Sequence, residues 1–323
     1  MNNITTSLAR GLCLILLACV FPSATFAQDA GGVLPVEDIE HALWHEPITI
    51  IQAEPAQAGG DGTQAVLLQR GEAPPLRVKV RPAPRGGEAF GNQPRYEVAA
   101  YQVQKLFLDP AQYVVPPTAV RCLPLDAYQA FDPFAEPTFA NTASVLFVLQ
   151  HHLAAASADK LFDQDRFKKD PMYARHLGHL LVFTYLIKHN NSNRDNTIIS
   201  GDPADPRLFS VENSTAFDAP AASRHGHAWR RFPVTRLPAE PIDRLRSVTL
   251  DAVREALAVI VQFRVEDGQL IPMESTENFN IRQGVRRAED MIQLGLTEKE
   301  IRDLYTRLED LLRLVGIGRI ETF

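Results

Sequence analysis

Five polar side chains, spread over four segments of the chain, are the candidates for chemistry. In chain order they are Lys79, Glu97, Asn191, Asn196 and Glu212. An amine, two carboxylates and two amides can donate or accept hydrogen bonds, and the carboxylate and amide oxygens can bind metal ions. Each of them, taken alone, also fits an ordinary structural place, such as the solvated face of a strand or a polar turn. Their order along the chain and the elements around them therefore decide what they indicate.

Lys79 and Glu97 belong to a predicted region of sheet with one helix. Residues 76–81 alternate between apolar and basic side chains, which is typical of a half-buried strand. Apolar side chains recur at helical spacing from Tyr96 to Phe107, so we expect a helix with Glu97 in its first turn. Further strands are predicted at 63–68, 119–123 and 144–149. Residues 60–150 should therefore form a small sheet with this helix laid on it.

The two asparagines lie in the polar run 189–196, between a predicted helix and a predicted hairpin. Asp170 followed by Pro171 is a strong helix start, because aspartate caps the first turn and proline suits the first helical position. Asn, Asp and Ser are also the ordinary residues of turns, so the run has a structural interpretation as well. Two short strand-like pieces then predict a hairpin, and Glu212 follows directly after it. They are residues 197–199 and 208–211.

The C-terminal third of the chain is predicted to be helical. Thr297 and Glu300 have the spacing of a capping box, which marks the start of the last helix. Apolar side chains from Ile301 to Val315 give that helix one core-facing side. The predicted order is thus a small sheet with one helix, followed by a helical lobe.

The polar run 189–196 and the segment 209–214 together resemble the catalytic core of atypical kinases. The most similar groups are the secretory-pathway kinases of the Golgi casein kinase type and the bacterial relatives of phosphatidylinositol kinases and of HipA-type kinases. The resemblance spans roughly residues 63–220. It implies an α+β, two-lobed, protein-kinase-like fold, with a small β-rich N-lobe that carries one helix and a larger helical C-lobe.

The resemblance implies a role for each of the five candidates. Residues 189–191 take the place of the kinase His-Arg-Asp, so Asn191 stands where the catalytic aspartate is usual. Asn196, five residues later, matches the metal-binding asparagine, and Glu212 takes the place of the metal-binding aspartate. Lys79 would then hold the nucleotide phosphates, and Glu97 would orient Lys79.

Departures from the kinase pattern bear on activity. The amide of Asn191 cannot accept a hydroxyl proton, and a positioned acid or base contributes about 10²–10⁴-fold to rate. Glu212 is one methylene longer than the usual aspartate, and no glycine-rich phosphate loop is visible. The resemblance, with these departures, implies a protein that binds ATP with Mg²⁺ or Mn²⁺ and has weak or absent phosphotransferase activity. The alternative is a catalytically dead scaffold that binds a protein partner of the cell envelope.

Residues 1–27 have the pattern of a cleavable secretory signal. Arg10 is followed by an apolar run from Leu12 to Phe21, a breaking proline and small residues up to Ala27. We therefore expect a periplasmic or secreted protein. A lipoprotein anchored through Cys19 remains an alternative. The predicted parts are a signal peptide at 1–27, a loose arm with one possible strand at 28–60, an N-lobe at 61–150 and a C-lobe at 151–323.

Composition excludes some classes of function. The net charge of −6 disfavours a nucleic-acid partner, because binding a phosphate backbone needs a basic face. After the predicted signal, Cys122 is the only cysteine, so an intramolecular disulfide is not expected. No later stretch is apolar for 18 residues, so we expect no transmembrane span in the mature chain.

Overall fold

The structure, a computed structural model, covers the chain except for several segments. The residues that it describes are 34–55, 62–153, 155–157, 162–189, 197–200, 207–217 and 233–323. The predicted signal at 1–27, Asn191 and Asn196 lie outside the described residues. Residues 34–323 form one compact unit.

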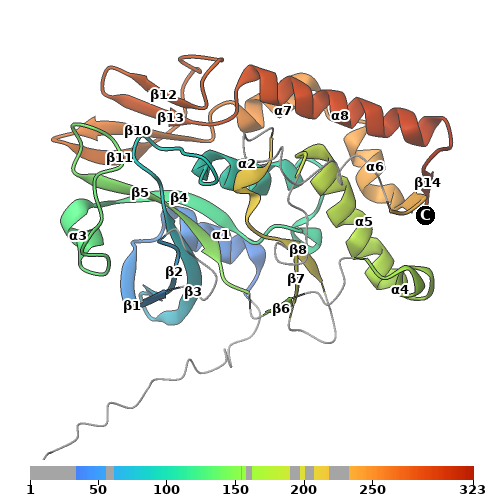
Figure 1. The fold of residues 1–323 in the computed structure, drawn as a ribbon, viewed down its shortest axis with the longest axis horizontal. Helices are drawn as coiled ribbons and strands as arrows, with labels where there is room; N and C mark the ends of the chain where they lie inside the picture. The colour runs from blue at the N-terminus through green and yellow to red at the C-terminus, as the bar shows by residue number, and fades with distance from the viewer. Residues whose placement is uncertain are drawn as a thin grey trace, which may run out of the picture. The chain divides into compact units, whose positions relative to one another are not determined.

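An antiparallel five-stranded sheet forms the first half of this unit (Figure 1). Its strand order is β1-β2-β3-β5-β4. The bounds are β1 (Thr49–Pro55), β2 (Gln64–Arg70), β3 (Ala73–Pro82), β4 (Thr118–Pro124) and β5 (Ser144–His151). The alternation in β3 buries Leu76, Val78 and Val80 and turns the intervening basic side chains to the other face. The strands predicted from periodicity are confirmed.

The segment before this sheet is more ordered than the sequence predicts. Instead of a loose arm at 28–60, the described part holds helix α1 (Val36–His45) and strand β1, which pairs with β2. Ile39, Ala42 and Leu43 follow helical spacing and pack into the core beneath the sheet. Burial of this apolar stripe is the physical reason that the arm folds.

Helix α2 (Pro94–Gln104) is the predicted helix, and it is buried on almost every side. It begins two residues before the predicted stripe, at Pro94, because proline suits the first turn of a helix. The helix contacts β4 and β5 on one side and α7 (Leu250–Leu257) on another. Because Arg95, Glu97 and Gln104 are buried with it, their polar groups need partners within the protein.

The second half of the unit is built mainly from helices. Asp170 caps α5 (Pro171–Leu186) by accepting a hydrogen bond from the Tyr173 amide, as predicted. Thr297 and Glu300 form the predicted capping box of α8 (Glu298–Gly316). This half also contains α4 (Gln164–Lys169), α6 (Ala239–Leu245) and the 3-10 turn η3 (Asn213–Thr215). Helix α3 (Leu125–Gln129) and the 3-10 turn η1 (Pro110–Gln112) belong to the first half. The fold class predicted from the sequence is confirmed, with an antiparallel sheet region first and a helical region after it.

A small sheet joins the two halves. Its strands are β6 (Ala155–Ser157), β7 (Thr197–Ser200) and β8 (Leu208–Ser210), and β7 pairs with β8 as the predicted hairpin. The amide of Ser210 also donates to the carbonyl of Val114 at 2.7 Å. This contact ties the end of β8 to the segment that follows α2.

The C-terminal third is not helical throughout. Between α7 and α8 lies a four-stranded antiparallel sheet in the order β11-β10-β13-β12 (Figure 1). The bounds are β10 (Val261–Glu266), β11 (Gln269–Met273), β12 (Val285–Ala288) and β13 (Met291–Leu294). Phe263 and Ile292 of this sheet pack with Val120 and Leu146 of the first sheet in one apolar cluster. Burial against β4 and β5 therefore favours strands where the sequence analysis predicts helix.

A short parallel pair joins β9 (Arg236–Leu237) to β14 (Glu321–Thr322), next to the C-terminal residue.

Within the part of the chain that the structure describes, no helix is both long and apolar enough to cross a bilayer.

Candidate functional site

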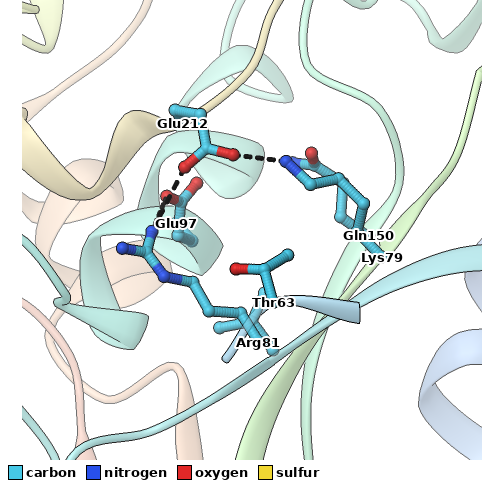
Figure 2. A pocket seen from close by; sticks show the side chains of 7 residues that line it. Thr63, Lys79, Arg81, Glu97, Gln150 and Glu212 are labelled. Atoms are coloured by element: carbon cyan, nitrogen blue, oxygen red, sulfur yellow. Dashed lines mark hydrogen bonds and ion pairs between the residues drawn. The ribbon is translucent and has the colours of Figure 1, made fainter. Parts of the chain in front are cut away.

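A small pocket lies where β3, α2 and the turn after β8 meet (Figure 2). Its cavity volume is about 20 Å³, room for about one water, and its mouth is open to solvent. The residues that line it are Thr63, Lys79, Arg81, Glu97, Val148, Gln150 and Glu212. Three of the five candidates, Lys79, Glu97 and Glu212, thus line one pocket, although they are far apart in sequence.

The positive side of the pocket comes from β3. Lys79 and Arg81 are two residues apart, so the strand places both side chains on the same face. The Lys79 ammonium donates to a carboxylate oxygen of Glu212. The Arg81 guanidinium donates to the second oxygen of Glu212 at 3.2 Å and to the Gly91 carbonyl at 2.8 Å. One carboxylate is therefore held between two cations.

Glu97 forms the buried negative side. Its two oxygens accept hydrogen bonds from the amides of Asn213, at 2.9 Å, and Ser214, at 2.8 Å. Arg81 lies 3.7 Å from one of these oxygens. Burial and the nearby charge of Glu212 raise the pKa of Glu97 to about 6, against the opposing effect of Arg81 and the amide hydrogen bonds. Glu97 thus anchors the backbone of the turn after β8 to α2.

Glu212 stands at the mouth of the pocket, and its side chain is 37% exposed. Its backbone is left-handed, with φ of 60°, which is uncommon for a residue other than glycine. Contacts on both sides stabilise this conformation. Glu97 accepts hydrogen bonds from the backbone amides of the two residues after Glu212, and Lys79 and Arg81 bind the Glu212 carboxylate. The fold therefore aims the Glu212 carboxylate at the two cations.

The segment that ends α5 is held next to the same turn. The His189 Nε2 atom lies 3.3 Å from the Glu212 carbonyl oxygen, and the Phe217 amide donates to the Ile187 carbonyl at 2.8 Å. His189 is almost fully buried, and this burial lowers its pKa to about 4, so the imidazole is neutral near pH 7. The first residue of the polar run 189–196 is therefore fixed beside Glu212.

The pairing of charges differs from the predicted one. We expected Glu97 to orient Lys79, but the ion pair that Lys79 makes is with Glu212, and the ion pair of Glu97 is with Arg81. Lys79 still lies near enough for its charge to lower the pKa of Glu97. The arrangement is thus a network of two cations and two carboxylates.

Arg81 is the site residue that the sequence analysis did not single out. A basic residue on an alternating strand usually faces solvent, so the sequence pattern offers no reason to expect Arg81 in a pocket. The available signal was its spacing of two residues from Lys79, which puts both on one face of β3. Ser214, whose hydroxyl lies 3.3 Å from Arg81, was also missed.

The arrangement suits an anionic, phosphate-bearing ligand. Arginine and lysine side chains bind phosphate oxygens by charge-assisted hydrogen bonds. Glu212 supplies an exposed carboxylate, which is the kind of oxygen ligand that Mg²⁺ and Mn²⁺ prefer. Among the residues that the structure describes, no three His, Cys, Asp or Glu side chains converge as a metal site. A metal ion there would need ligands from elsewhere, such as Asn196 and the ligand itself.

No protein-family model and no curated protein sequence matches this chain significantly. Solved structures are similar to it at the level of the fold. The structure of hydra Fam20 with sugar has a TM-score of 0.52 and 13% identity, covering 88% of this chain and 95% of that one. The MAP kinase LmaMPK10 from Leishmania major has a TM-score of 0.29 and 13% identity, covering 56% of this chain and 50% of that one. Over most of the chain, the likeness to the Fam20 structure shows a kinase-like fold.

Proposed function

We propose that this chain is an exported, atypical-kinase-like protein that binds a nucleotide and has weak or absent phosphotransferase activity. The observation that carries the proposal is the convergence of Lys79, Arg81, Glu97 and Glu212 in one pocket of a kinase-like fold. Their types are the ones that hold phosphates and a divalent metal ion in phosphoryl transfer.

In the proposed complex the nucleotide phosphates replace Glu212 as the partner of Lys79. Arg81 stays in place through the Gly91 carbonyl and Glu97, and it adds a second positive charge beside the phosphates. Glu97 keeps the turn at 213–214 attached to α2. Glu212 and Asn196 are the proposed ligands of Mg²⁺ or Mn²⁺. When bound, the metal ion would neutralise part of the phosphate charge.

Weak or absent transfer is proposed because of Asn191. An asparagine amide does not take up the proton of an attacking hydroxyl, so the general base of the kinase pattern is missing from its usual position. Phosphoryl transfer depends mainly on positioning and on electrostatic stabilisation, which the remaining groups still provide. This combination supports nucleotide binding more strongly than it supports catalysis.

The test is the binding of ATP by the purified protein, measured by isothermal titration calorimetry with Mg²⁺ present. Lys79→Ala should weaken binding by about tenfold or more, because a charge-assisted contact to a phosphate is lost. Lys299→Ala is the matched control, since Lys299 is on α8 with a side chain 77% exposed and lies outside the pocket. Equal affinities of wild type and Lys79→Ala for ATP would show that this pocket does not bind the nucleotide.

A scaffold without catalysis is the second candidate. It is favoured by one observation, that Glu212 already satisfies both Lys79 and Arg81 and so neutralises the cationic side of the pocket. A scaffold of this kind would act through its surface on an envelope protein. It predicts that nucleotides have no metal-dependent effect on the protein.

Export rests on the pattern of residues 1–27. Mass spectrometry of the protein recovered from the producing cells should give a chain that begins at Gln28. A lipid-modified chain that begins at Cys19 would support the lipoprotein alternative. A chain that retains Met1 and is found in the cytoplasm would contradict export.

A further inference from the structure

A second pocket lies between α5, the segment that follows η1 and the start of β8. It shares no residue with the pocket around Lys79. Its cavity volume on the same measure is about 170 Å³, well above the roughly 15 Å³ that holds one water. The cavity is therefore large enough for a small polyatomic ligand.

Basic side chains dominate the walls of this pocket. Arg175, His176 and His179 come from α5, and Arg207 comes from the residue before β8. Of the described residues that line it, none is an aspartate or a glutamate. Two guanidinium groups around one cavity create a positive potential that attracts anions, and arginine favours planar or tetrahedral oxyanions. The electrostatics of the pocket thus indicate an anionic ligand.

His179 is the second and independent observation. The residue lines the pocket and is 2% exposed, and its Nε2 atom is buried without a hydrogen-bond partner in the described part of the chain. Buried polar atoms in folded proteins are nearly always paired, so an orphaned one marks a position for a ligand or a water. Burial, followed by the charges of His176, Arg175 and Arg207, lowers the pKa of His179 to about 4. A neutral imidazole with its proton on Nε2 can donate to an oxyanion.

The walls of the pocket are held rigidly. The buried side chain of Gln104, on α2, accepts from the amides of Val114 and Val115 at 2.8 and 2.9 Å and donates to the Val115 carbonyl at 3.0 Å. The guanidinium of Arg207 donates to the Tyr113 carbonyl at 2.6 Å. The Arg207 guanidinium is thus fixed before a ligand arrives, which lowers the ordering cost of binding.

We propose that this pocket is a binding site for a tetrahedral oxyanion, a phosphate or sulfate, with Arg175, Arg207 and His179 as its donors. The oxyanion can come as the free ion or as the ester of a small molecule. The site is independent of the nucleotide proposal, because the two pockets have no residue in common.

The test is isothermal titration calorimetry of the purified protein with sodium phosphate, sodium sulfate, sodium acetate and glycerol phosphate, at constant ionic strength set by sodium chloride. Phosphate and sulfate should bind more tightly than acetate. A tighter affinity for glycerol phosphate than for inorganic phosphate assigns the site to an ester, and the reverse order assigns it to the free ion. Because Lys79 is itself proposed to bind phosphate, the two sites are separated by variants of the second pocket alone, which leave every residue of the first pocket in place.

Two variants test the donors. Arg175→Gln and His179→Leu should each weaken phosphate binding by about tenfold, the loss of one good hydrogen bond to an oxyanion. Arg246→Gln is the control, because Arg246 is 55% exposed and outside the pocket. His179→Leu should melt no lower than wild type, because it removes an unpaired buried polar atom. Phosphate binding no tighter than acetate, or affinities unaltered in Arg175→Gln and His179→Leu, would overturn the proposal.

Discussion

Glu97 combines two tasks that usually belong to separate residues. It carries a buried charge beside Arg81, and it accepts the two amides that begin the η3 turn. Because these hydrogen bonds join α2 to the residues just after Glu212, the position of the Glu212 carboxylate depends on Glu97. The geometry of the pocket is therefore sensitive to the protonation of one side chain.

Glu97→Gln should change how the stability of the protein depends on pH. The pKa of Glu97 is raised from 4.5 to about 6 in the folded protein, so the folded state holds this proton more tightly than the unfolded state. Its contribution to stability is therefore full below about pH 4.5 and is lost as the pH rises to about 6. Relative to Glu97→Gln, the wild type should lose on the order of 1–2 kcal/mol across that window.

Urea unfolding of both proteins at several values between pH 4 and pH 7 measures this difference. The comparison between the two proteins cancels the contributions of the other carboxylates, several of which have lowered pKa values, such as Glu46 and Glu298. Parallel profiles for wild type and Glu97→Gln would show that Glu97 is not the group responsible.

Asn191→Asp should convert weak or absent phosphoryl transfer into measurable transfer. The change restores a carboxylate at the position of the kinase general base, and such a group contributes about 10²–10⁴-fold. The readout is ATP consumption by wild type and variant under the same conditions, with Asn190→Asp as the matched control next in sequence. Activity that is unchanged in Asn191→Asp would contradict the role assigned to this residue.

At the scale of elements, a buried ion pair connects the start of α2 to the start of α8. Arg95 at the start of α2 makes two hydrogen bonds to the carboxylate of Glu300, at 2.8 and 3.0 Å, and the Tyr96 hydroxyl bonds to the same carboxylate. Burial favours the neutral form of Glu300, but the hydrogen bonds and charge of Arg95 outweigh it and lower its pKa. The helix that carries Glu97 is thus fixed to the C-terminal helix by a buried ion pair.

Glu300→Gln should destabilise the protein by about 3 kcal/mol, because removing one partner of a buried ion pair leaves the other charge poorly compensated. It should also weaken nucleotide binding, since α2 positions Glu97. Urea unfolding with Glu309→Gln as the control measures the effect, because Glu309 is an exposed residue of the same helix. A loss no greater than that of the control would show that the α2–α8 contact contributes little.

How well the elements could be predicted depends on where their signal lies. The alternation of β3, the apolar stripe of α2 and the caps of α5 and α8 are local patterns, and the structure has all of them. The hairpin of β10 and β11 was missed although Asp267 and Gly268, with φ of 49° and 79°, are a typical two-residue turn. Its strands are stabilised by packing on β4 and β5, which no local pattern shows.

The candidate site shows the same limit. Lys79, Glu97 and Glu212 could be found because a known order of residue types connects them, and they line one pocket. The sequence could not predict that Arg81 pairs with Glu97 and Lys79 with Glu212. These pairs depend on how β3 and the turn after β8 lie relative to each other in space. The roles of Asn191 and Asn196 stay predictions, since both lie outside the described residues.

At the scale of the whole molecule, the described residues from 34 to 323 belong to one compact unit with both pockets on it. The second sheet packs on the first through Phe263, Ile292 and their neighbours, while α2 contacts sheet and helices alike. A ligand that binds the pocket around Lys79 should therefore stabilise the molecule as a whole and not one part of it. This coupling makes the melting temperature a sensitive measure of binding.

The most direct measurement is the melting temperature of the purified protein with ATP and with ADP, each in the presence of Mg²⁺, of Mn²⁺ and of EDTA. A ligand at 100 times its dissociation constant adds about 2.7 kcal/mol of stability, a rise of about 5 °C for a protein of this size. The account predicts a rise of this order that requires the metal ion. No rise with any combination of nucleotide and metal would contradict a nucleotide site and favour the scaffold.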